Sequence, residues 1–358
     1  MKKLSLAVSL AALMAASSAY AADNDSTIDQ IDVNNSTATV TQSQAGGNTN
    51  TSVIMQRKST VTGEGNNLTA TVNQGVISAP PIFNAVNNDN QSNILQAGKN
   101  ASATVDQGGF GTSQANDSQI VQRGIGGVNS TNQVHVIQRG GNNTNTSRIG
   151  EVDSNNEFVK FGQDGEDLTA RVEQAGLGNM NTSHITQVGN GVSPNPTAVG
   201  DENINVSQSG IDNINISTID QNGTALKSTV VQGGIDLDNT SDIIQQGNGS
   251  DVSVTQLGAG GTNDTNWSTV DQDGIGSTVI VIQDGIDNTN DSEIVQHGDG
   301  STITVTQDGD GNQNTSDVFQ IGANNSTVTI SQGGTDLTNL SSVTQSNGNN
   351  LVATVTQN

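Results

Sequence analysis

The residues of this sequence that could perform acid–base or metal chemistry are three histidines and 35 acidic residues. A general acid and a general base must lie close together to act on one substrate. His135, His184 and His297 are far apart in the chain, and the strand pattern described below places His135 and His184 on outward faces of separate repeats. There is no cysteine to act as a nucleophile. We therefore expect no catalytic residue, no metal site and no bound cofactor.

Runs of glycine and aspartate resemble the turns of a calcium-binding β-roll. They include "GDGS" at residues 298–301 and "DGDGN" at residues 308–312. The β-roll repeats every nine residues, whereas these runs belong to a repeat of about 24 residues. A dedicated calcium cage is not expected, and weak cation binding at the acidic turns stays open.

Amides and serines recur at fixed spacing through the chain. The pattern N-x-S-x-x-x-Q occurs eleven times between Asn24 and Gln345, and a further copy, from Asn145, ends in Glu151. A second seven-residue segment that ends in glutamine lies between successive copies. In the five C-terminal repeats these positions are Asn239, Ser241, Gln245, Ser250, Gln256, Asn266, Ser268, Gln272, Ser277, Gln283, Asn290, Ser292, Gln296, Ser301, Gln307, Asn314, Ser316, Gln320, Gln332, Asn339, Ser341, Gln345 and Gln357.

The spacing within each segment predicts a β-strand. Alternate residues of a strand share one face, and this groups Asn290, Ser292, Ile294 and Gln296 around an aliphatic centre. Turns rich in glycine, asparagine and aspartate separate the segments, as suits tight turns with positive φ. The turn residues expected on this basis are Gly247, Gly274, Gly298 and Gly309.

One strand–turn–strand unit is too small to bury its own aliphatic face, so successive units must stack. The predicted fold is an all-β, two-sided β-solenoid with a period of about 24 residues, and twelve coils at a strand spacing of about 4.8 Å would span ~58 Å. Stacking places identical amides above and below one another, so their donors and acceptors are satisfied along ladders. We expect serines to add hydroxyl contacts in the same rows.

The regular pattern is interrupted at several places. Residues 75–89 and 188–201 read as inserted loops and contain the four prolines of the chain. Gln163 ends what looks like a second-type segment, and the segment that ends at Gln174 then has no counterpart.

The N-terminus has the pattern of a secretory signal peptide. Two lysines precede an apolar run, and Ala19-Tyr20-Ala21 fits a cleavage site, which divides the chain into a signal at 1–21 and a solenoid at 22–358. No later run reaches the length of a membrane helix. Removal of the signal takes two lysines and no acid from the formal charge of −24, leaving −26, so nucleic acid is not an expected partner.

The repeat resembles that of the curlin family, the subunits of bacterial curli fibres, commonly written S-x5-Q-x-G-x-x-N-x5-Q. Residues Asn290, Gln296, Gly298, Ser301 and Gln307 fit it with asparagine and serine exchanged. The resemblance implies a secreted subunit that polymerises into a cross-β amyloid fibre on the surface of a Gram-negative cell. A minor nucleator subunit and a dedicated outer-membrane secretion channel are the partners that it implies.

The final repeat, Asn339 to Gln357, keeps the full pattern without a recognisable cap. We therefore expect the chain to assemble by end-to-end β-strand addition. A soluble repeat adhesin or an ice-binding solenoid is the alternative, because threonines such as Thr302, Thr304 and Thr306 form outward rows. Lys227 and Phe158 fall on the same face in other coils and interrupt such an array.

Overall fold

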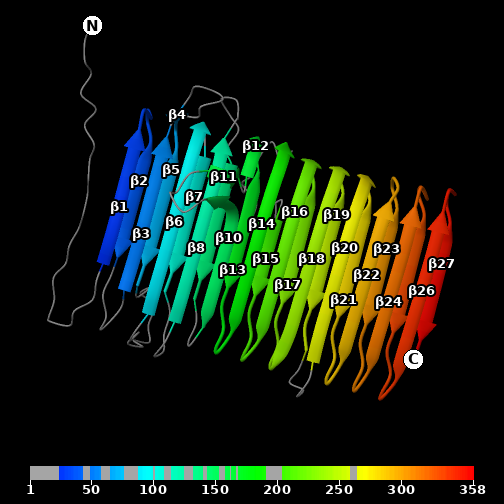
Figure 1. Cartoon of the computed structure of the whole chain (residues 1–358). Helices are drawn as coiled ribbons and strands as arrows, with labels where there is room; N and C mark the ends of the chain where they lie inside the picture. The colour runs from blue at the N-terminus through cyan, green and yellow to red at the C-terminus, as the bar shows by residue number, and fades with distance from the viewer. Residues whose placement is uncertain are drawn as a thin grey trace, which may run out of the picture.

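In the computed structural model, two parallel β-sheets face each other from β1 and β2 to β26 and β27 (Figure 1). The structure describes residues 24–42, 49–57, 65–75, 88–99, 101–108, 114–124, 132–139, 143–152, 158–161, 163–166, 168–190, 204–258 and 264–358. The expected signal at 1–21 and most of both inserted loops lie outside these residues. Asn88 and Asp89 open a strand, and residues 188–190 close one, so these parts of the predicted loops belong to the sheet.

The first sheet contains the N-x-S segments. In spatial order its strands are β1 (Asn24–Ile31), β3 (Thr49–Arg57), β6 (Asn88–Lys99), β8 (Gln114–Gly124), β10 (Thr144–Val152), β14 (Met180–Asn190), β16 (Ile214–Thr224), β18 (Leu237–Asn248), β20 (Asp264–Ile275), β22 (Thr289–His297), β24 (Gln313–Ile321) and β26 (Thr338–Ser346).

The second sheet contains the other segment of each repeat. Its strands are β2 (Thr37–Gln42), β5 (Thr69–Gln74), β7 (Ala101–Gln107), β9 (Asn132–Gln138), β13 (Thr169–Gln174), β15 (Ile204–Gln208), β17 (Lys227–Gln232), β19 (Asp251–Gln256), β21 (Thr278–Gln283), β23 (Thr302–Gln307), β25 (Thr327–Gln332) and β27 (Val352–Gln357). The chain alternates between the sheets, and each sheet passes through twelve strands, so the predicted two-sided solenoid is confirmed.

The register aligns identical residues of successive coils. Asn215 pairs with Asn239, and Gln232 pairs with Gln256. The step between stacked asparagines is 24 to 27 residues from Asn215 onward, as predicted. It rises to 40 residues between Asn50 and Asn90, because inserted segments lengthen some coils of the N-terminal half without breaking the register.

A narrow aliphatic core lies between the sheets. Most of the strands with described side chains alternate buried and less buried residues, as in β23, where Ile303, Val305 and Gln307 point inward. Isoleucine and valine from consecutive coils form one buried cluster that extends from Ile54 to Val343. These β-branched side chains pack well against their equivalents on neighbouring strands. A sequence with few apolar residues can therefore still form a continuous core.

One coil differs from its sequence prediction. The short strand β12 (Gln163–Glu166) places Gln163 in the first sheet, between Gln122 and Gln187. The spacing predicts that Gln163 ends a second-sheet segment, and that prediction is wrong. Gln174, predicted to lack a counterpart, pairs in the second sheet with Gln138 and Gln208. The short strand β11 (Phe158–Phe161) folds back antiparallel on β10 between the two parts of this coil.

A second coil is interrupted in a similar way. The two-residue strand β4 (Gly65–Asn66) pairs with β6 beyond the end of β3, so the strand resumes after an insertion. Within the described residues, no helix is long and apolar enough to span a membrane.

Candidate functional site

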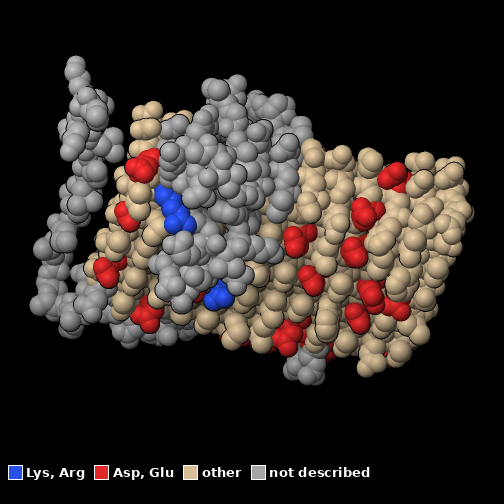
Figure 2. Space-filling model, turned by 45° about the horizontal axis from the view of Figure 1, so that its top comes forward, with Lys and Arg blue, Asp and Glu red and all other residues tan. Residues whose placement is uncertain are grey.

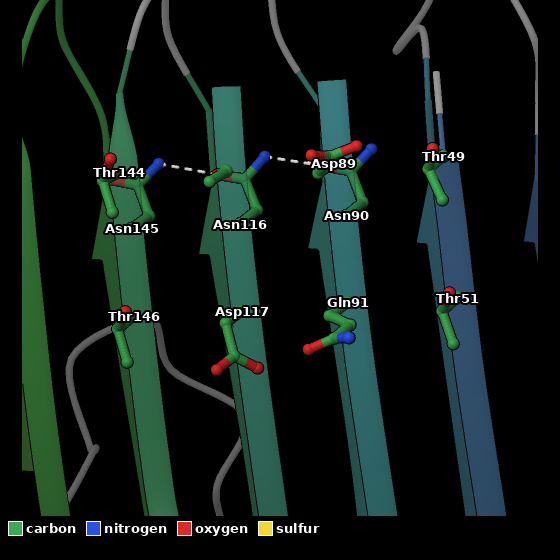
Figure 3. Close-up of a pocket in the computed structure, with 11 residues that line it drawn as sticks. Thr49, Thr51, Asp89, Asn90, Gln91, Asn116, Asp117, Thr144, Asn145 and Thr146 are labelled. Atoms are coloured by element: carbon green, nitrogen blue, oxygen red, sulfur yellow. Dashed lines mark hydrogen bonds between the residues drawn. The ribbon is translucent and has the colours of Figure 1, made fainter. Parts of the chain in front are cut away.

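A ladder of asparagines runs through the first sheet from Asn24 to Asn339. The Nδ2 of each asparagine donates to the Oδ1 of the asparagine on the preceding coil, over 2.7 to 2.9 Å. Figure 3 shows part of this row, with Asn145 joined to Asn116 and Asn116 joined to Asn90. Every donation in the ladder points toward the N-terminal end of the solenoid.

Two glutamine ladders run in the opposite sense. In the second sheet each Nε2 from Gln42 to Gln332 donates to the Oε1 of the following coil, over 2.8 to 3.0 Å. In the first sheet the same bonds run from Gln30 to Gln122 and from Gln187 to Gln345. Many of these amides also donate to backbone carbonyls across the core, as Gln283 does to Trp267.

The ladder positions predicted in the five C-terminal repeats lie where the sequence placed them. All are buried except Gln357, which is half-buried in the last strand. The predicted amide ladders are confirmed by their side-chain hydrogen bonds. Because each buried amide needs two donors and its oxygen satisfied, the stack supplies what a single coil lacks.

The serines behave differently in the two sheets. Ser250, Ser277 and Ser301 of the second row donate to backbone carbonyls of the next coil. In the first sheet, the hydroxyls of Ser241, Ser268 and their equivalents have no hydrogen-bond partner among the described residues. The expectation that serines add hydroxyl contacts holds for the second row and is wrong for the first.

The four predicted turn glycines have two distinct roles. Gly247 and Gly309 adopt φ of 100° and 125°. Gly274 and Gly298 do not have positive φ. In the turn after β22, the glycine with positive φ is Gly300, at 62°. Gly298 is required by close packing, because a Cβ there would lie 2.5 Å from the carbonyl oxygen of Ala323.

A further asparagine column lies in the turns that lead into the first sheet. Asn288 Nδ2 donates to the carbonyls of Asp284 and Gly309, and Asn288 Oδ1 accepts from the backbone N–H of Asn312. Asn143, Asn179 and Asn213 make the same set of contacts. The signal in the sequence was N-x-N, as in Asn288-Thr-Asn290, and sequence reasoning overlooked the first asparagine.

The two ends of the solenoid expose complementary groups. β1 and β2 form one end and β26 and β27 the other. Within the described residues, Oε1 of Gln30 and Gln42 accept no hydrogen bond at the first end, and Oδ1 of Asn339 accepts none at the last. Because the asparagine and glutamine ladders run in opposite senses, each end offers the donors that the other end's acceptors require.

Toward the C-terminal end, the outer surface carries acidic residues without lysine or arginine. No lysine or arginine follows Lys227 in the sequence, and Figure 2 shows scattered aspartates and glutamates over this part of one face. Burial raises the pKa of Asp242, and the charge of Asp220 raises it further. On the second sheet, a hydrogen bond from His135 and another from Asn73 hold the pKa of Asp106 low against the effect of burial.

These two carboxyls predict opposite responses to pH. Ionised Asp242 disfavours the fold, so Asp242→Asn should stabilise the protein at pH 7 by about 0.5 kcal/mol, and the difference should vanish as pH falls through the raised pKa. Asp106 contributes stability above its unfolded pKa, so Asp106→Asn should cost about 1 kcal/mol at pH 7 and nothing once pH falls through the lowered pKa. Urea unfolding at pH 7 and pH 3 measures both. The same sign of change for the two variants at pH 7 would contradict this account.

A shallow polar hollow of about 470 Å³ lies at the start of β3, β6, β8 and β10 (Figure 3). Its side chains include Thr51, Gln91, Asp117 and Thr146. Burial raises the pKa of Asp117, and Arg148, 3.9 Å away, lowers it in part. Within the described residues, no three histidine or acidic side chains are arranged to hold a metal ion. The hollow therefore offers polar contacts from threonine, glutamine and aspartate side chains.

The fold and its ladders define the class of this protein as a parallel two-sheet β-solenoid with a core of stacked amides. No protein-family model matches the sequence, and no curated protein matches it. The likeness to curlins consequently rests on the repeat spacing and on the buried amide ladders.

Proposed function

We propose that this chain is the structural subunit of an extracellular, curli-like amyloid fibre that grows by end-to-end β-strand addition. The observation that supports it best is the pair of open, complementary ends. Among the described residues, the outer edges of both end layers have no strand partner, whereas most soluble proteins block such edges with charges, proline or bulges. A second copy placed on one end would continue both sheets and all three amide ladders.

The register of the proposed junction follows from that of the coils. β26 would pair with β1 of the next copy, with Asn339 on Asn24 and Gln345 on Gln30, and β27 would pair with β2, with Gln357 on Gln42. Gln345 and Gln357 would donate to the two free Oε1 atoms, and Asn24 would donate to Asn339. Pairing of two like ends would run the strands antiparallel, so it would not continue the parallel register in which the coils stack.

The charges of the end coils favour the same junction. Residues 337–358 contain no charged side chain, while β1 carries Asp25 and Asp29. The proposed register sets these beside Leu340 and Thr344, so no like charges meet. Inside the solenoid, by contrast, Glu293 lies directly beside Asp317. The C-terminal layer is thus the least repulsive surface in an otherwise acidic half of the molecule.

The resemblance to curlins extends the proposal to the setting of the fibre. The subunit would be secreted through a dedicated outer-membrane channel, started by a minor nucleator subunit, and assembled on the surface of a Gram-negative cell for adhesion, aggregation and biofilm matrix. The strong negative charge of the chain disfavours nucleic acid as a partner. A structural role without catalysis is part of the proposal.

Incubation of the purified mature chain tests this function. We expect thioflavin fluorescence to rise with time and the product to give a reflection at about 4.7 Å in fibre diffraction, because continued stacking repeats the strand spacing. A chain that stays monomeric at high concentration and gives no such reflection would instead support a soluble solenoid adhesin.

A further inference from the structure

A column of buried serine hydroxyls runs along the core beside the asparagine ladder. Successive members pair in register from strand to strand of the first sheet, and each is at most 3% exposed. None of these hydroxyls has a hydrogen-bond partner among the described residues. The column comprises Ser52, Ser92, Ser118, Ser147, Ser183, Ser217, Ser241, Ser268, Ser292, Ser316 and Ser341.

The surrounding protein groups are already engaged. The hydroxyls of neighbouring coils are about 4.8 Å apart, the strand spacing, which is too far for a direct hydrogen bond. The asparagine two residues before each serine donates to the asparagine ladder, as Asn266 does to Asn239. Gln256 Nε2 donates to the carbonyls of Thr240 and Asn266, at the start of two first-sheet strands. Two residues away along each strand, Ser241 therefore lies across the core from Val254, which has no polar side-chain group.

An unpartnered column of this length would be incompatible with a stable fold. One buried hydroxyl without a partner costs a sizeable fraction of the net stability of a domain, and eleven would exceed it. Alanine would fill the same position without that cost. The repeated choice of serine therefore indicates that a small polar ligand satisfies these hydroxyls.

We propose that the column binds a file of ordered water molecules, with each water bridging the hydroxyls of two successive coils. A water about 2.8 Å from both oxygens, which are about 4.8 Å apart, makes an angle near 120° between them, close to the preferred geometry of water. Serine is the smallest side chain in the inward row of each strand, between asparagine and isoleucine or valine, so this row has the most space for a water.

The second-sheet serines supply an internal control. Ser277 and Ser301 are equally buried, yet their hydroxyls donate to the carbonyls of Gly298 and Ala323. The core thus contains two rows of buried serines. The hydroxyls of the second-sheet row have protein partners, and those of the first-sheet row have none among the described residues. The proposal concerns the folded chain itself and does not depend on polymerisation.

Magnetisation transfer from water to serine side chains, measured by NMR on the full mature chain, tests the proposal directly. We expect transfer to the Hβ protons of the first-sheet serines at mixing times that leave the buried valine methyls without signal. Transfer to the second-sheet serines should be at least threefold weaker. Equal transfer to both serine rows, or none to the first, would overturn the proposal.

Paired variants give an independent test. Ser268→Ala combined with Ser292→Ala removes two adjacent partners of the same water, so the urea midpoint should fall, whereas a dry column predicts that removing two unsatisfied hydroxyls raises it. An unchanged or raised midpoint overturns the proposal. If the double variant does not fold, the water-transfer experiment on the unaltered chain decides the question.

Discussion

Proline at either open edge should abolish fibre growth while leaving the subunit folded. In β27 the carbonyls of Leu351 and Gln357 accept from β25, so the alternate residue Thr354 directs its backbone N–H to the open edge. In β2 the N–H of Thr37 donates to Leu68, so Ala38 faces the opposite open edge. Thr354→Pro and Ala38→Pro each remove a donor that the next copy needs and place a ring against the incoming strand.

The two variants together distinguish polar from symmetric assembly. Each alone should show no rise in thioflavin fluorescence over at least ten times the lag of the unaltered chain. A 1:1 mixture should form heterodimers that stop there, because one variant retains a free C-terminal end and the other a free N-terminal end. Light scattering with sedimentation measures the dimer.

The matched controls keep the backbone donors at the same positions. Thr354→Ala and Ala38→Ser should polymerise at rates close to that of the unaltered chain. Dimers of Ala38→Pro alone would indicate pairing of two like ends and would contradict the proposed junction. Failure of the unaltered chain to polymerise would instead contradict the fibre function as a whole.

Most of the fold could be predicted from the strand pattern, because the inward residues occupy strictly alternate positions in each segment. Asn290, Ser292, Ile294 and Gln296 can share a face only in a strand. The same pattern recurs 24 positions on, with valine in place of isoleucine, so stacking is the way to bury that face. The core, the two sheets and the amide ladders of the C-terminal half followed from this reasoning. The direction of each ladder did not, because residue types carry no information on which way an amide points.

The interrupted coils were beyond reach for a related reason. A repeat is found in the sequence from the spacing of residues along the chain. In the sheet, residues are instead aligned by their register with the neighbouring strands. Gln163 follows an insertion after Glu151, and no local feature indicates that the strand resumes there in the register of Gln122. The lack of hydrogen-bond partners for the first-sheet serines could not be predicted either, because the sequence does not indicate whether a serine hydroxyl has an acceptor within reach.

A charge placed inside a glutamine ladder should destabilise the solenoid more than any surface change. Gln283 is fully buried, donates to Gln307 and to the carbonyl of Trp267, and accepts from Gln256. Gln283→Glu removes both donations and sets a carboxylate against two carbonyl oxygens. An uncompensated buried charge of this kind costs about 3–5 kcal/mol, against a net stability of about 5–15 kcal/mol for a typical domain.

The matched control for this variant is Gln246→Glu, which makes the same chemical change on an exposed side chain of β18. Urea unfolding at pH 7 should show a large loss of stability for Gln283→Glu and a change within about 0.5 kcal/mol for the control. Lowering the pH should restore part of the loss, because burial raises the folded pKa of the introduced carboxyl, and the neutral carboxyl can again donate one hydrogen bond. Equal midpoints for the two variants would mean that the ladders do not hold the coils together, and the proposed junction, which extends the same ladders between copies, would lose its physical basis.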